Sequence, residues 1–171
     1  MSSNPFLSKF NTPFNTIPFD KITVEHYLPA FEEGIKQGLA EIDTIVNNTD
    51  TPSFSNTIEA LEKVGALLEI VSSTFSNLNL AETSKEMQAL AKVISPKLSD
   101  YSNDIILNDA LFKRVEAVYN VKNTLTLTPE QSTLLDKTYK GFVRNGSKLN
   151  AEQKEKLRTI DKEKSQCSLT Y

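Results

Sequence analysis

The sequence predicts an all-α fold, a bundle of about six helices preceded by an extended N-terminal arm rich in proline and phenylalanine. Apolar residues recur at steps of three and four along most of the chain, which is the spacing of one helix face. Capping residues, turn clusters and prolines separate these segments from one another. The 171 residues, 39% hydrophobic and 24% charged, have a globular composition and are enough to bury a core.

Residues 1–22 form the predicted arm, and residues 23–171 form the predicted helical domain. Pro5, Pro13 and Pro18 prevent a continuous helix in the arm. The four phenylalanines of this segment would each cost roughly 1.5–3 kcal/mol if they stayed in water. We therefore expect the arm to pack on its own domain or, as the less favoured alternative, on protein outside these 171 residues.

The first helical stripe runs to Val46, with Thr23 as a predicted N-cap. Pro29 is expected either to begin the main helix or to kink an earlier turn. Gly34 and Gly38 lie inside this helix, where each costs about 1 kcal/mol relative to alanine. Close approach of another element would offset that cost.

A second helix is expected from Ser53 or Ser55 to about residue 78. Its apolar sector is wide, so we predict that it is the central helix of the bundle. A third helix is expected over residues 84–107, bent at Pro96 because proline removes one backbone hydrogen bond. Asn108 is a predicted N-cap for a short fourth helix.

The fifth helix is predicted to begin at the capping sequence Thr128-Pro129-Glu130-Gln131 and to end near Gly146. The last helix begins near Asn150 and has no stop signal, so we expect the chain to be cut from something longer. Its predicted inward stripe is Leu157, Ile160, Lys164 and Cys167. Its charged side chains are predicted to form a solvated outer face, and they are Glu152, Lys154, Glu155, Lys156, Arg158, Asp161, Lys162 and Glu163.

Composition also narrows the partners that we expect. The formal net charge is −3, and no basic stripe is present, so nucleic acid is not a predicted partner. No run of about 18 apolar residues predicts a membrane span, and the first residues do not resemble a signal peptide. We therefore expect a cytoplasmic protein. One cysteine excludes an intrachain disulfide.

The residues alone predict no catalytic, cofactor-binding or metal-binding site. His26 lies near Glu25, Glu32 and Glu33, but one imidazole with carboxylates is a poor zinc site, and we expect a partly buried structural histidine. Cys167 is expected to be a small core residue rather than a nucleophile. Three tyrosines could face a substrate but are expected in the core or at its rim: Tyr27, Tyr101 and Tyr139.

Six segments occur in an order and spacing that are together specific, although none is diagnostic alone. They are NPFL (4–7), PFDKI (18–22), EHYLPAFEEG (25–34), FSNTIEALE (54–62), ISPKL (94–98) and LNDALFKRV (107–115). In these segments the sequence resembles the N-terminal region of the thimet-oligopeptidase family of zinc metallopeptidases, in its bacterial peptidyl-dipeptidase and oligopeptidase A branches. The resemblance extends over nearly the whole chain.

This resemblance implies a large, mostly helical enzyme with a deep, narrow channel between two halves. In the family, zinc is held by the two histidines of an H-E-x-x-H helix and a later glutamate, and the glutamate of that motif activates water. The motif is absent from these 171 residues, so no zinc ligand or catalytic residue carries over. The N-terminal helices are implied to form part of one channel wall, which admits only short unfolded peptides.

Two hypotheses follow. The first is that the chain is the inactive N-terminal part of a zinc peptidyl-dipeptidase, which releases C-terminal dipeptides. Its partners would then be short peptides and the remainder of its own polypeptide, and the isolated chain would expose apolar surface and self-associate. The second is that the chain is a free-standing helical interaction module without peptidase activity.

Overall fold

The structure, a computed structural model, describes residues 4–167, and within that range all regular elements are helical. The predicted all-α class is confirmed. The six long helices are α1 (Val24–Val46), α3 (Ala66–Ala81), α4 (Lys85–Ile106), α5 (Asp109–Asn120), α6 (Pro129–Arg144) and α7 (Ala151–Cys167). The short elements are α2 (Ala60–Glu62), a π-helical turn (Phe54–Glu59) and four 3₁₀ turns (Pro5–Leu7, Pro13–Asn15, Phe19–Lys21 and Lys122–Thr124).

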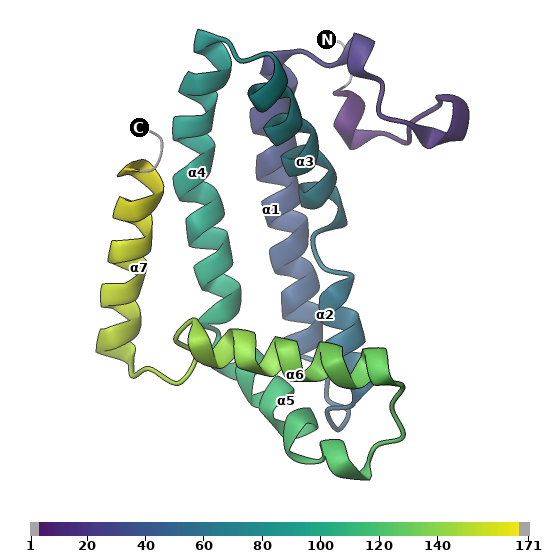
Figure 1. Cartoon of the computed structure of the whole chain (residues 1–171), viewed down its shortest axis with the longest axis vertical. Coiled ribbons are helices and arrows are strands. Elements are labelled where there is room, and N and C mark those ends of the chain that lie inside the picture. The colour runs from purple at the N-terminus through teal and green to yellow at the C-terminus, as the bar shows by residue number, and fades with distance from the viewer. Residues whose placement is uncertain (1–3, 168–171) are drawn as a thin grey trace.

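Four helices, α1, α3, α4 and α7, lie side by side along the long axis of the molecule, as Figure 1 shows. Helices α5 and α6 cross one end of this array, and the N-terminal arm lies at the other end (Figure 1). Helix α1 contacts α3, α4 and α5, so α1 occupies the central position. The prediction that residues 53–78 form the central helix is therefore wrong.

Glycines on α1 explain why that helix can take the central position. A Cβ atom on Gly34 would lie 3.1 Å from the backbone of Leu68, and one on Gly38 would lie 2.2 Å from the hydroxyl oxygen of Tyr101. The Tyr101 hydroxyl of α4 thus lies where a Cβ on Gly38 would clash, and the backbone of α3 lies so near Gly34 that a Cβ there would force a small shift. The predicted close approach at both glycines is confirmed.

The predicted second helix is interrupted. Its start at Ser53 is confirmed, since the Ser53 hydroxyl accepts a hydrogen bond from the Asn56 N–H at 3.2 Å. The helix then breaks before α3 because Gly65 adopts a left-handed conformation with φ of 79°. The N–H of Gly65 donates to the Glu41 carboxylate of α1 at 2.8 Å, so the break is fixed by a contact distant in the sequence.

Most predicted helix ends are confirmed. Helix α1 begins after Thr23, so Pro29 lies inside it and neither begins it nor precedes it. The Asn108 side chain caps α5, and Thr128 and Gln131 form a capping box at the start of α6. Gly146 follows α6 with φ of 98°, the left-handed conformation that favours glycine at a helix terminus.

The buried apolar residues form two clusters that α1 connects. The first lies among the N-terminal half of α1, α3, α4 and the arm. The second lies among the C-terminal end of α1, the 54–62 segment, α5 and α6. Its aromatic side chains stack on one another, with the Tyr119 and Tyr139 rings 3.8 Å apart and nearly parallel.

The arm packs partly on its own domain, through its first phenylalanine. Phe6 is buried, and its ring lies 5.3 Å from that of Tyr27. The Asn4 amide donates to the backbone carbonyl of His26 at 2.8 Å, which anchors the arm to the first turn of α1. Phe14, in contrast, is 97% exposed, so the favoured expectation holds for Phe6 and fails for Phe14.

Candidate functional site

The histidine that the sequence analysis considered as a ligand has a structural role. The backbone N–H of Thr23 donates to Nδ1 of His26 at 3.0 Å, so the ring closes the first turn of α1. His26 is partly buried at the junction of arm and helix, as expected. The nearby acids also have partners, since Glu32 pairs with Lys97 at 3.0 Å and Glu33 pairs with Lys36 at 3.5 Å.

The other residues considered from the sequence lie apart from one another. Cys167 is exposed at the end of α7, so the prediction of a core cysteine is wrong. Tyr27 is buried, and its burial raises the pKa of its hydroxyl. Tyr101 and Tyr139 are half-buried, at the rim as expected. Within residues 4–167, no three His, Cys, Asp or Glu side chains are grouped to hold a metal ion, so this part of the chain does not fit a zinc site.

A groove of about 930 Å³ lies between α4 and α7. The end of α6 and the turn that follows it also line the groove. On α4 its lining includes Ser95, Ser99, Ser102 and Asn103, a polar stripe at helical spacing. Leu98, Ile106, Val143, Leu149 and Leu157 provide its apolar part.

One wall of the groove, α7, is attached to α4 by charged side chains. Lys154, Arg158 and Lys162 recur every four residues, and each meets an acid across the interface. Arg158 Nη1 lies 2.8 Å from a carboxylate oxygen of Asp104, and Lys162 Nζ lies 3.8 Å from one of Asp100. The interface runs antiparallel, because the later residue of α7 meets the earlier residue of α4.

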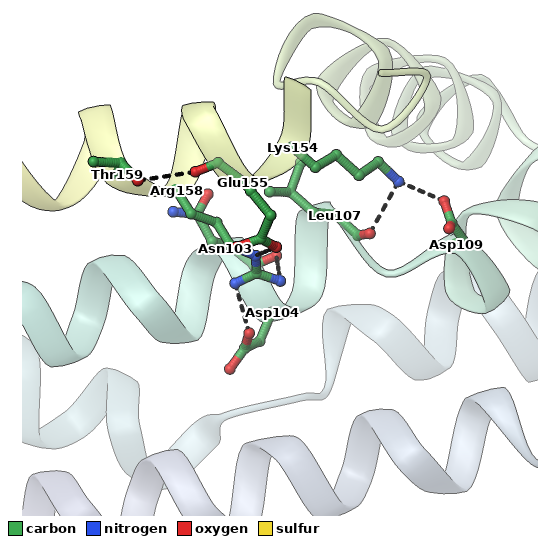
Figure 2. Close-up of polar contacts among 8 residues, drawn as sticks. All are labelled: Asn103, Asp104, Leu107, Asp109, Lys154, Glu155, Arg158 and Thr159. Carbon is green, nitrogen blue, oxygen red and sulfur yellow. Dashed lines mark hydrogen bonds and ion pairs between the residues drawn. The ribbon is translucent and has the colours of Figure 1, made fainter. Parts of the chain in front are cut away.

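Lys154 occupies the most enclosed position in this interface. Its ammonium donates to the backbone carbonyl of Leu107 at 3.1 Å and to the carboxylate of Asp109, as Figure 2 shows. The hydrogen bond from Lys154 lowers the pKa of the Asp109 carboxyl below its usual value. Among the described residues of α7, Lys154 alone is buried.

The predicted orientation of the last helix is wrong in part, although Leu157 of the expected inward stripe is half-buried and lines the groove as predicted. Its expected inward stripe includes Ile160, which is 58% exposed, and Cys167, which is also exposed. Lys154 and Arg158, predicted to face water, instead meet acids of α5 and α4. The other charged residues of the predicted outer face include Glu152, Glu155, Lys156 and Glu163, which are exposed as predicted. The periodicity of the α7 sequence does not indicate these contacts, because Asp109 and Asp104 lie about 50 residues earlier in the chain.

Asn103 is the residue of the groove that the sequence analysis missed. It is 6% exposed, and its side-chain Nδ2 has no hydrogen-bond partner within the described structure. The spacing of Asn103 after three serines is the signal in the sequence that places Asn103 on a polar face of α4. Asn103 is therefore a buried polar side chain beneath the groove whose Nδ2 has no protein partner among the described residues.

Comparisons with known proteins show which proteins this chain is similar to. No family model matches the chain. The chain is 42% identical to a dipeptidyl carboxypeptidase of Salmonella typhimurium strain LT2, over 95% of this chain and 24% of that protein. It is 41% identical to the dipeptidyl carboxypeptidase of Escherichia coli strain K12, over 94% of this chain and 24% of that protein. It is related to the thimet-oligopeptidase family of peptidases.

The resemblance seen in the six sequence segments is confirmed by these matches. Oligopeptidase A of Escherichia coli strain K12 is also similar, with 25% identity over 99% of this chain and 24% of that protein. The chain thus spans about a quarter of the length of the curated relatives that it matches. None of the described helices is long and apolar enough to cross a membrane.

Proposed function

We propose that this chain is the N-terminal, non-catalytic portion of a zinc metallopeptidase that releases dipeptides from the C-termini of short peptides. The observation that supports this proposal is the 42% identity to a dipeptidyl carboxypeptidase over 95% of the chain. Identity to oligopeptidase A is lower, at 25%, which favours dipeptide release over internal cleavage.

In this proposal the helices form part of one wall of the peptidase channel, and the zinc ligands lie on the polypeptide that this chain does not span. Exposed apolar side chains support a wall that contacts further protein. Phe14 is 97% exposed on the arm, and Leu80 is 86% exposed near the end of α3. The cytoplasmic location stays a prediction.

Two measurements test the proposal. The reading frame that encodes the chain should continue beyond Tyr171 for several hundred residues and should encode H-E-x-x-H. A stop codon directly after Tyr171 would instead favour the free-standing interaction module. The purified 171-residue chain should bind no stoichiometric zinc by metal analysis and should cleave no fluorogenic peptide, and detection of either contradicts a non-catalytic role.

The complete protein should show the specificity that the identities favour. We expect mass spectrometry to detect successive loss of dipeptides from a peptide with a free C-terminus. The same peptide with an amidated C-terminus is the matched control and should stay largely intact. Equal cleavage of both peptides at internal bonds would assign the complete protein to the oligopeptidase class instead.

A further inference from the structure

Helix α3 has an outer face that differs from those of the other long helices. From Ile70 to Ala81 the sequence contains no charged residue, whereas every two turns of α1, α4, α5, α6 and α7 contain at least one. The outer face of a helix that meets water is normally polar and charged. The central part of a protein interface, in contrast, is depleted in charged residues. The outer face of α3 thus has the charge pattern of a covered surface.

Apolar residues stand at both ends of this face. Ile70, Ser73, Asn77 and Leu80 follow one another at steps of three, four and three, so they form one stripe along α3. All four are exposed, Leu80 most of all, at 86%. The ends of the stripe are 10 positions apart, which corresponds to about 15 Å at 1.5 Å per residue. A second helix could contact the stripe over nearly three turns.

The N-terminal arm extends this surface beyond the start of α3. A hollow of about 410 Å³ between the arm, α1 and α3 is lined by Leu7 and Leu67, among others. Figure 1 shows that α3 and the arm lie on the side of the molecule away from α7. Five of the eight large apolar side chains that are exposed within residues 4–167 belong to the arm or to α3, and they are Leu7, Phe14, Phe19, Ile70 and Leu80.

The length of the relatives indicates what covers the stripe. The chain corresponds to 24% of each of the two dipeptidyl carboxypeptidases, so about three quarters of each relative lies outside the matched region. A stripe of about 15 Å is small for a stable dimer, which usually buries at least about 1,200 Å². It is large enough for a segment of the same polypeptide, because covalent connection gives that segment a high effective concentration.

We propose that the outer face of α3, defined by Ile70, Ser73, Asn77 and Leu80, is the surface on which a later segment of the same polypeptide packs. That segment is apolar where it covers Ile70 and Leu80. It supplies hydrogen bonds to Ser73 and Asn77, whose side chains have none within residues 4–167. The inference rests on the function proposed above, since that proposal supplies the later segment.

The accessibility of thiols placed on α3 tests the proposal. Ser73→Cys and Asn77→Cys are each made in the 171-residue chain and in the complete protein, with Cys167→Ser to remove the exposed native thiol. Mass spectrometry of peptides then measures the rate of reaction with a maleimide. Both thiols should react at least about tenfold more slowly in the complete protein, because buried thiols are inert. The control Lys156→Cys, on the charged outer face of α7, should react equally in both proteins.

A second measurement uses a charge in place of a thiol. Asn77→Lys should leave the urea midpoint of the 171-residue chain unchanged, because Asn77 is exposed there. It should lower the midpoint of the complete protein, because it places an unpaired charge in a contact between packed segments. The matched control is Asn120→Lys, the same change at the exposed end of α5, and it should leave both midpoints unchanged.

The possible failures can be told apart. Equal reaction of the α3 thiols in both proteins, with H-E-x-x-H present in the reading frame, would overturn this inference and leave the proposed function standing. Equal slowing at Lys156→Cys would show that the protection is not specific to α3. Protection in the 171-residue chain that rises with its concentration would assign the face to a second copy instead. A stop codon directly after Tyr171 would overturn both proposals.

Discussion

The attachment of α7 to the bundle gives the sharpest test of the structure, through the substitution Lys154→Met. Methionine keeps the length of the apolar stem and removes the ammonium group. The change therefore removes the hydrogen bonds to the Leu107 carbonyl and the Asp109 carboxylate while it leaves the packing nearly intact.

The expected loss of stability is about 2 kcal/mol. A hydrogen bond that involves a charged group contributes about 1.5–3 kcal/mol, and the one to the buried Leu107 carbonyl belongs to this class. The contact with Asp109 adds less, because the Asp109 side chain is 75% exposed and water screens the pair. Burial of the ammonium itself costs free energy, so its removal offsets part of the loss.

Urea unfolding followed by circular dichroism measures the global effect, and amide hydrogen exchange measures the attachment of α7. Exchange in α7 should accelerate more than exchange in α5 or α6, because Lys154 connects α7 to the rest of the chain. The matched control is Lys156→Met on the same helix, whose pair with Glu152 is exposed on both sides. It should change stability by less than about 0.5 kcal/mol.

Equal effects of the two substitutions would refute the reasoning, since they would mean that Lys154 contributes no more than a surface charge. Faster exchange throughout the bundle, without preference for α7, would also contradict it. In that case Lys154 would stabilise the fold as a whole and would not act as a local attachment of α7.

Four further predictions follow from the packing and the charges. Gly38→Ala should destabilise the protein by about 1–3 kcal/mol in urea unfolding, because its Cβ would lie 2.2 Å from the Tyr101 hydroxyl oxygen. Gly141→Ala, with no atom within 4 Å of its Cβ, should stabilise it by up to about 1 kcal/mol. The lowered pKa of Asp109 stabilises the fold above the usual carboxyl pKa of about 3.9, so the protection of α7 amides, corrected for the intrinsic exchange rate, should fall relative to that of α5 as the pH drops below about 4. Sodium chloride at about 1 M should accelerate exchange in α7 more than in α3, whose contacts are apolar.

The fold class and most helix ends could be predicted from the sequence because local signals determine them. The caps at Asn108 and Thr128 and the terminator at Gly146 act within one turn of their helices. Apolar stripes identify the faces of α1, α4 and α5 because those helices bury apolar side chains. The need for close approach at Gly34 and Gly38 is also a local signal, since only a contact justifies glycine there.

Contacts between distant segments account for the predictions that failed. The break at Gly65 depends on Glu41, which lies 24 residues earlier in α1. A buried arginine, Arg114, is fixed in the same manner, since its guanidinium donates to the carbonyl of Asn48 at 2.7 Å. The polar stripe that includes Asn103 was visible in the sequence, but its position in a groove depends on where α7 and the end of α6 pack.

Helix α7 depends both on local sequence signals and on contacts between distant segments. The other long helices bury clusters of apolar side chains, whereas the one buried residue among the described part of α7 is Lys154, and α7 meets α5 and α4 through the ion pairs of Lys154 and Arg158. The strength of this attachment therefore varies with ionic conditions, and with it the width of the groove that α7 borders.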